Sequence, residues 1–344
     1  MAEKGSFKIP KWLKILLPVL VSGGILLYVS TLVDWNGFLE AVKDLTWYSI
    51  AAVPILFLLS LLVQAYKYWL FIRKAPLWPV MSGYASTAFF FNMPMGAVTG
   101  PASLILILKR YAGPIKLGSS FILDNYTKIM SMLMVLLLGV AVSNFGPPIW
   151  VLVLFAVILL AGLLLFALLI FPKGNQFLAG KSQKMREGKW KEKLWMQKTA
   201  EGIEQMCKAG ALFHDRKRNI LVHFALGMVS EIFLAFPYMV IAKAINLDIP
   251  VQNWLWIHSI IRVFCMIPLT VGGLGAREGA MMLVRQWTGM PSGPSMTLSL
   301  LYSVMSILSW AILSAVFFWL MPRRSPQGEK QRFRELSKPL PEER

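Results

Sequence analysis

Three charged side chains lie inside strongly apolar segments of the sequence: Asp124, Lys128 and Glu231. A charge at the centre of a membrane costs at least about 2.5 kcal/mol on insertion scales, so each of them is expected to have a partner or a task. Asp124 and Lys128 have the spacing of an ion pair within one helix, and the alternative is a ligand site. Glu231 has no basic residue four positions away. It is therefore expected either to carry a proton coupled to transport or to pair with Arg262 or Arg277.

A second group of charges surrounds a stretch rich in glycine, from Pro268 to Gly275. An arginine beside the start of a broken helix can hold a phosphate with its forked guanidinium, while free backbone N–H groups of that helix add further donors. We therefore expect an anionic headgroup to bind here, with Glu278 holding one arginine in place. The alternative is an ion-paired cluster that only fixes the local fold. The expected headgroup site consists of Arg262, Arg277, Glu278, Gly272, Gly273 and Gly275.

No residue pattern for catalysis accompanies these charges. The three histidines are scattered, and Cys207 and Cys265 lie far apart, so no metal site, disulfide or cofactor is expected. The sequence holds no HExxH, GxSxG, P-loop or GxGxxG pattern. A membrane-embedded transferase with Asp124 and Glu231 as acid and base is the catalytic alternative, and their spacing alone gives it no support.

The composition is that of a membrane protein. The chain has 344 residues, of which 56% are hydrophobic and only 15% charged, whereas about a quarter are charged in an ordinary soluble domain. This excludes a soluble enzyme. The formal net charge of +18 comes without a nucleic-acid-binding motif, so nucleic acid is not an expected partner.

Six uninterrupted apolar segments are long enough to cross a bilayer. They are Trp12–Val33, Trp47–Ile72, Ser119–Ser143, Ile149–Phe171, Ile220–Ala242 and Thr297–Leu320. The first follows a basic N-terminus but ends without a small-residue cleavage pattern, so it is interpreted as a retained helix rather than a signal peptide. Lys67, near one end of the second segment, is expected to snorkel to the membrane interface.

Two further apolar segments, Tyr84–Leu108 and Trp254–Val284, are interrupted in their middles. The distribution of basic residues decides whether these two segments cross. If all eight segments crossed, the stretch 172–219, with twelve basic and five acidic residues, would lie outside the cell. The expected breaks, at which the helix stops, are Pro94, Gly96, Gly100 and Pro268.

The charge pattern predicts an all-α polytopic protein with six crossings and two re-entrant helical hairpins. Both termini and the basic loops then lie in the cytoplasm, and only poorly charged loops lie outside. The order of crossing, hairpin and crossing occurs twice in opposite orientations, which predicts an inverted repeat with a site near the membrane midplane. The alternative is that proline and glycine only kink two ordinary spans.

Three parts of the chain are expected from this topology. Residues 1–11 form a cytoplasmic tail, residues 12–321 the transmembrane domain, and residues 322–344 a basic, partly disordered cytoplasmic tail. The basic loop 172–219 belongs to the second part. Within it, helical spacing of apolar residues predicts an amphipathic helix over Trp190–Phe213, on the inner leaflet or in the cytoplasm.

The stretch Ile267–Ala280, with the sequence IPLTVGGLGAREGA, resembles the signature of a flippase-like family, the transmembrane region of lysylphosphatidylglycerol synthases. The resemblance extends to Asn92–Gly96, to Lys109–Gly113 and to Asp124. Family members often carry a charged pair after the first break, where this chain has neutral Ala102 and Ser103. The resemblance therefore assigns importance to the second break, at Pro268, Gly272, Gly273, Gly275, Arg277, Glu278 and Gly279.

This resemblance implies that polar or charged lipids move between the leaflets of the cytoplasmic membrane. In the two-part synthases a soluble C-terminal domain performs aminoacyl transfer, so we expect a stand-alone translocator without this enzymatic activity. The implied ligands are anionic phospholipids, glycolipids or polyprenyl-linked lipids. A lipid-modifying enzyme or glycosyltransferase is an implied partner, and an accessory subunit of such an enzyme is a further alternative.

Overall fold

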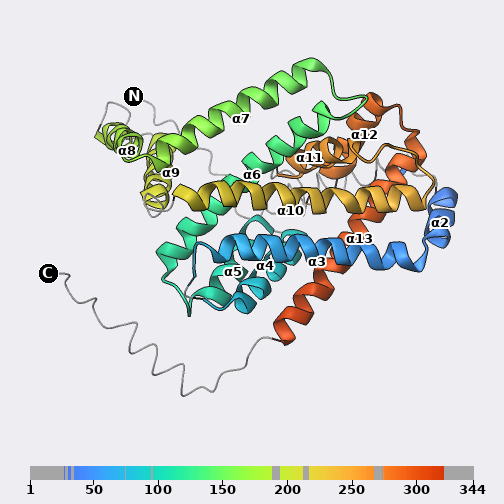
Figure 1. Cartoon of the computed structure of the whole chain (residues 1–344), viewed down its shortest axis with the longest axis horizontal. Coiled ribbons are helices and arrows are strands. Elements are labelled where there is room, and N and C mark those ends of the chain that lie inside the picture. The colour runs from blue at the N-terminus through green and yellow to red at the C-terminus, as the bar shows by residue number, and fades with distance from the viewer. Residues whose placement is uncertain are drawn as a thin grey trace, which may run out of the picture.

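A computed structural model describes residues 27, 30–31, 35–73, 75–93, 96–187, 194–211, 217–266, 273 and 275–320. Every regular element in these ranges is a helix (Figure 1). The helices are α2 (Trp35–Asp44), α3 (Trp47–Trp69), α4 (Leu77–Phe91), α5 (Gly96–Leu108), α6 (Pro114–Ala141), α7 (Ile149–Ile170), α8 (Pro172–Glu187), α9 (Leu194–Ala211), α10 (Lys217–Ala244), α11 (Asn253–Met266), α12 (Ala276–Thr288) and α13 (Ser292–Trp319). The first predicted span, Trp12–Val33, lies outside the described residues except for Leu27, Ser30 and Thr31. The C-terminal tail lies wholly outside them.

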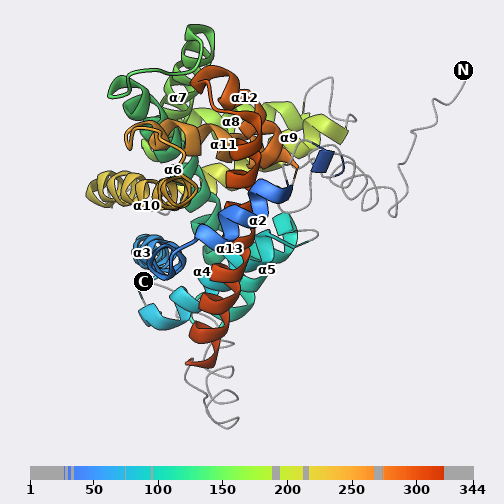
Figure 2. The same ribbon diagram turned by 90° about the vertical axis from the view of Figure 1, so that its right-hand side faces the viewer.

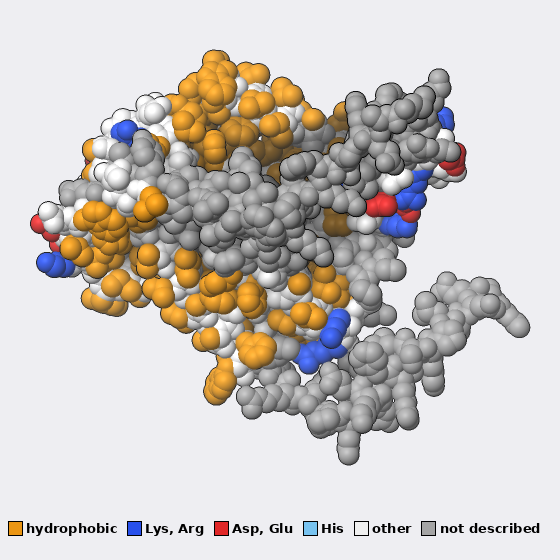
Figure 3. Space-filling model, turned by 180° about the vertical axis from the view of Figure 1, so that it is seen from behind, with side chains coloured by type: hydrophobic (Ala, Val, Ile, Leu, Met, Phe, Trp, Pro, Cys, Tyr) orange, Lys and Arg blue, Asp and Glu red, His pale blue; other side chains and the backbone are white. Residues whose placement is uncertain are grey.

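Five of the described helices are long and apolar enough to cross a membrane: α3, α6, α7, α10 and α13. They correspond to five of the six predicted spans, so this is a multi-pass membrane protein. Three of them begin earlier than predicted: α6 starts at Pro114, α10 at Lys217, and α13 at Ser292 after the N-cap Pro291. Apolar side chains cover much of the back face, and charged ones gather toward its ends (Figure 3).

Two pairs of shorter helices replace the interrupted segments. The helices α4 and α5 have 15 and 13 residues and pack closely on each other, and α11 and α12, with 14 and 13 residues, form the second pair. At 1.5 Å per residue each helix is about 20 Å long, which is less than the roughly 30 Å of the hydrocarbon core. A Cβ atom at Gly100 would lie 2.9 Å from the Phe91 ring, so glycine permits the close return of α5 along α4.

The packing of the helices follows one pattern twice. The helices α3 and α10 run antiparallel along the centre of the molecule (Figure 1) and lie side by side when seen end-on (Figure 2). The helix α4 packs on α3 and also on α13, while α11 packs on α10 and also on α6. The first short pair therefore contacts α13, the last helix of the second half, and the second short pair contacts α6, the last long helix of the first half.

The basic loop between the halves contains two packed helices rather than one. The helix α9 falls inside the predicted amphipathic segment, whereas α8 has too few apolar residues to be predicted. Asn175 on α8 donates hydrogen bonds to the backbone oxygens of Leu169 and Cys207, both at 2.8 Å, and Ser182 donates one to Ala200 at 2.8 Å. Polar contacts with the ends of neighbouring helices thus hold α8 in place.

Gly139 on α6 provides a test of this packing. A Cβ atom there would lie 2.8 Å from Leu255 Cβ and from the Trp256 backbone nitrogen on α11. We expect Gly139→Ala to destabilise the protein by about 1–3 kcal/mol, because α11 must move away. The measurement is the apparent melting temperature in detergent, followed by size-exclusion chromatography.

Gly118→Ala is the matched control, since it lies on the same helix with no atom within 4 Å of the added carbon. It should be neutral or stabilising by up to about 1 kcal/mol, because alanine favours helices over glycine. Equal melting temperatures for the two variants would contradict the close contact of α6 with α11.

Candidate functional site

Asp124 on α6 is held by residues of two other helices. Lys67 Nζ on α3 lies 3.1 Å from Asp124 Oδ1, and the Tyr84 hydroxyl on α4 donates a hydrogen bond to Oδ2. Lys67 also donates to Thr127 Oγ1 at 3.2 Å. The prediction that Lys67 snorkels to the interface is wrong, because only 1% of this residue is exposed. Packing of α4, α6 and α10 around α3 leaves the side chain no route to the surface.

Lys128 does not form the predicted ion pair with Asp124. The Asp124 carboxylate is turned toward α3 and α4, and Lys128 Nζ donates a hydrogen bond to Gln64 Oε1 on α3 at 2.8 Å. Gln64 Nε2 in turn donates to Ser60 Oγ at 2.8 Å, and Ser60 Oγ lies 3.0 Å from Ser230 Oγ on α10. A row of polar side chains therefore joins α6, α3 and α10.

Glu231 follows Ser230 on α10 and is fully buried. Its Oε2 atom lies 3.4 Å from His258 Nε2 and 3.6 Å from Arg262 Nε, both on α11. Pairing with Arg262 was one of the predicted alternatives, whereas His258 was missed. The spacing of His258 and Arg262, one helical turn apart, was the signal that could have found it.

Glu278 and Arg277 lie at the start of α12. Glu278 Oε2 accepts a hydrogen bond from the Gly275 backbone N–H at 2.6 Å, which caps the helix. Glu278 Oε1 accepts hydrogen bonds from Ser299 at 3.3 Å and from Ser303 at 3.2 Å, both on α13. Arg277 Nη1 donates to Ser303 Oγ at 2.6 Å. Glu278 is therefore connected to Arg277 through a shared serine.

The serines of α13 were not predicted as site residues. They recur at helical spacing in an otherwise apolar helix, and that polar stripe was the available signal. The buried members are Ser295, Ser299, Ser303, Ser306 and Ser309.

Backbone geometry at the second break requires glycine. Gly273 and Gly275 have φ angles of +77° and +85°, which side-chain-bearing residues rarely adopt. A Cβ atom on Gly273 would also lie 3.2 Å from Cys265. The predicted break residues Gly272, Pro268 and Pro94 lie outside the described residues. Gly96 is the first residue of α5, whereas Gly100 lies inside that helix, so the helix does not stop at Gly100 as predicted.

Aromatic residues occupy corresponding places in the two halves. Tyr68 on α3 lies 5.5 Å, ring to ring, from Tyr84 on α4, and Tyr238 on α10 lies 5.9 Å from His258 on α11. Tyr68 and Tyr238 are separated by the same number of residues as Ser60 and Ser230, which contact each other. Tyr84 and His258 are separated by the same number of residues as Pro94 and Pro268, the prolines of the two breaks. This register relates the site of one half to that of the other.

A register shifted by one residue from that of the two prolines aligns Gly100 with Gly275. Ala102 and Ser103 follow Gly100 at the distance at which Arg277 and Glu278 follow Gly275. In the first half the buried ion pair comes instead from the long helices α3 and α6. Charge is therefore present in both halves but on different elements.

The polar row lies near half-height of the helices. Ser60, Lys128 and Glu231 are close to the middle of the candidate spans Trp47–Trp69, Lys116–Ala141 and Leu221–Ala244. Among the described residues, no group of three or more His, Cys, Asp or Glu side chains is arranged to hold a metal ion. The arrangement offers cationic and hydroxyl donors near the middle of these helices, which is chemistry for holding an anion or a polar headgroup.

Lys67 and Lys128 provide a matched test of these assignments. Lys67→Met leaves Asp124 buried without its counter-charge, so we expect a loss of about 3–5 kcal/mol in stability. Lys67→Met combined with Asp124→Asn should recover most of that loss. The measurement is the apparent melting temperature of purified protein.

Lys128→Met should lower the stability far less, because this change leaves no carboxylate without its counter-charge. Equal destabilisation by Lys67→Met and Lys128→Met would contradict the assigned ion pairing.

Comparison with known proteins shows the family to which the chain belongs. No curated protein matches the chain. A family model, described as the lysylphosphatidylglycerol synthase TM region, matches residues 15–324, which includes both short helix pairs and every residue of the polar row. The chain therefore belongs to the family of the lysylphosphatidylglycerol synthase transmembrane region.

Proposed function

We propose that this protein translocates a polar or anionic lipid between the leaflets of the cytoplasmic membrane. The lipid headgroup passes between the two short helix pairs, and its chains remain among the lipid tails. The observation that carries this proposal is the row of charged and hydroxyl side chains at half-height, which links α3, α6, α10 and α11. A headgroup in the hydrocarbon core needs such donors, because lipid tails offer none.

The family supports the same function. The matching family is the membrane region of enzymes named for a lipid product, lysylphosphatidylglycerol. Fixed donors at half-height suit transport better than lipid synthesis, since no activated nucleophile accompanies them in the described site. The proposed activity makes and breaks no covalent bond, and its ligands are membrane lipids.

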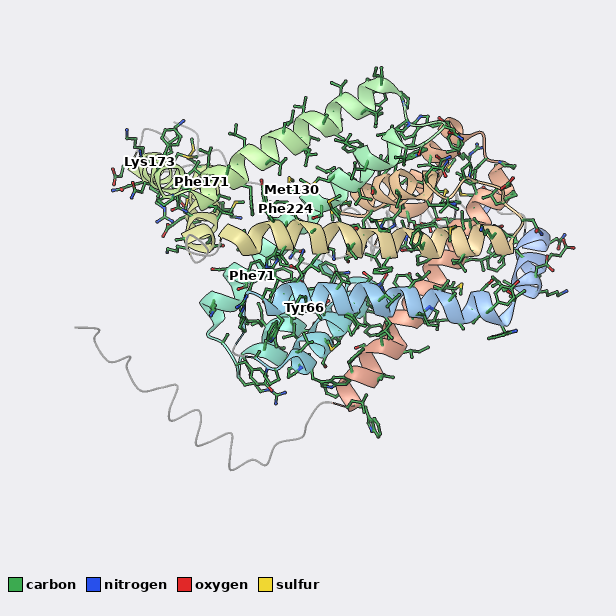
Figure 4. All side chains as sticks on the ribbon, viewed as in Figure 1. Tyr66, Phe71, Met130, Phe171, Lys173 and Phe224 are labelled. Carbon is green, nitrogen blue, oxygen red and sulfur yellow. The ribbon has the colours of Figure 1, made fainter. Side chains whose placement is uncertain are left out.

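The proposed topology has six crossings, two re-entrant hairpins and cytoplasmic termini. Phe71 at the end of α3 and Phe171 and Lys173 at the α7–α8 junction lie toward the same end of the molecule (Figure 4). The helices α8 and α9 lie at that end, while α2 and the α6–α7 connection lie toward the other (Figure 1). This division matches the predicted cytoplasmic and outer segments.

An inverted repeat accounts for the packing. If each helix of α3–α6 is matched in order with a helix of α10–α13, the two sets make the same contacts with one another. The first helices of the two sets, α3 and α10, run in opposite directions (Figure 1). Transporters with such repeats place their substrate between the two broken elements, near the midplane. The polar row lies near the middle of α3, α6 and α10, which supports this assignment.

Reconstitution in liposomes tests translocation. Fluorescent phosphatidylglycerol is incorporated in both leaflets, and dithionite quenches only the outer leaflet. We expect nearly complete quenching with the protein and about half without it, and Arg262→Gln should slow the protein-dependent phase. Arg186→Gln, which removes an exposed arginine of α8, is the control with unchanged rate. Half-quenching with folded wild-type protein and several headgroups would refute the proposal.

Cysteine labelling tests the hairpins. In a background with Cys207→Ser and Cys265→Ala, an impermeant reagent should reach Arg73→Cys and Lys109→Cys from the cytoplasmic face only. Val251→Cys and Ser292→Cys should react from the outer face only. These residues flank the two short pairs and are exposed or partly exposed. Opposite faces for the two flanks of either pair would show that it crosses the membrane.

A further inference from the structure

Lys128 is the one cation of the described site that lacks a carboxylate partner. The cations there are Lys67, Lys128, Arg262 and Arg277, and the carboxylates are Asp124, Glu231 and Glu278. Asp124 pairs with Lys67, Glu231 with Arg262, and Glu278 with Arg277 through Ser303. Four cations thus face three carboxylates, and Lys128 remains.

The surroundings of Lys128 do not neutralise its charge. Its hydrogen-bond partner, Gln64, is a neutral amide, and no carboxylate of the described residues lies within 4.0 Å of its amine. At longer range Arg262 and Lys67 repel it, whereas Glu231 and Asp124 attract it. Both carboxylates are already paired, Glu231 with Arg262 and Asp124 with Lys67. A lone ammonium at half-height is costly, so its retention points to a counter-ion that arrives with a ligand.

Arg262 on α11 is a second cation beside the row of polar side chains, because its partner Glu231 follows Ser230 on α10. The Arg262 Nε atom lies 3.6 Å from Glu231 Oε2 and is buried without a hydrogen-bond partner among the described residues. The Arg262 side chain is 27% exposed and Lys128 is partly exposed, whereas Lys67 and Arg277 are 1% and 9% exposed. Arg277 is also occupied, because it donates to Ser303 and stands 5.1 Å from the centre of the Tyr302 ring. Lys128 and Arg262 are therefore the two cations that a ligand can reach.

We propose that Lys128 and Arg262 together bind the phosphate of an anionic phospholipid at the membrane midplane. This inference deepens the proposed function by naming the chemical class of the headgroup and its two anchoring residues. Arg277 and Glu278 are then positioning residues, which fix α12 against α13 rather than contacting the lipid. A forked guanidinium and a point-charge ammonium, from α11 and α6, hold the phosphate from two sides.

Equilibrium lipid binding tests this assignment independently of transport. Full-length protein in detergent is titrated with phosphatidylglycerol and, separately, with a glucosyl diacylglycerol that has no phosphate, and bound lipid is counted by native mass spectrometry. We expect Lys128→Gln to weaken phosphatidylglycerol binding about tenfold or more, the effect of losing one charge-assisted hydrogen bond. Binding of the glucosyl lipid should not change.

Two further variants sharpen the result. Lys128→Arg keeps the charge and should bind phosphatidylglycerol within a few-fold of wild type. Lys116→Gln, on the same helix near its start, is the control for charge removal and should behave as wild type. Unchanged phosphatidylglycerol binding in folded Lys128→Gln overturns the proposal, and so does an equal loss for both lipids.

The source of the phosphate is tested in the same experiment. Bound phosphatidylglycerol should persist in millimolar inorganic phosphate or glycerol phosphate, because its acyl chains add affinity. Displacement by inorganic phosphate would assign the site to a soluble anion and overturn the lipid assignment. Since binding is measured without a bilayer, failure of the liposome assay leaves this result interpretable, and the converse also holds.

Discussion

A charged side chain inside a bilayer needs a counter-charge from the protein or from a bound ligand, because lipid tails supply neither ions nor hydrogen bonds. This constraint accounts for the arrangement of the long helices. Lys67 with Asp124 joins α3 to α6, and Glu231 with Arg262 joins α10 to α11. The amide and hydroxyl groups between these pairs connect the two halves at half-height. Burying these polar residues costs free energy, but their pairing also specifies which helices are neighbours.

The apolar pattern predicted most of the membrane architecture. Runs such as Ile149–Phe171 are long enough to mark a span by length alone, and five of the six predicted spans correspond to long apolar helices. Helix starts were less accurate, since Pro114 begins α6 before hydrophobicity becomes visible. The helix α8 was missed, because its stability comes from hydrogen bonds to distant backbone atoms rather than from periodicity.

Partners across helices could not be predicted from spacing. Asp124 and Lys128 satisfied the rule for an intrahelical pair, yet the better electrostatic partner of Asp124 was fifty-seven positions away, on α3. A single sequence does not reveal which helix faces which. Glu231 was predicted to pair with one of two arginines, and the structure selects Arg262, which lies one turn from His258 on the same face of α11.

Each short helix pair packs on a long helix of the other half, and this affects when the membrane domain can assemble. The pair α4 and α5 leaves the ribosome long before α13, on which α4 packs. Until then, one flank of the first half is open to lipid, with hydroxyl groups such as Ser86, which later lies 3.3 Å from Ser314 on α13. Each half depends on a helix of the other half to cover its short pair, so this packing is complete only after the last helix has been made.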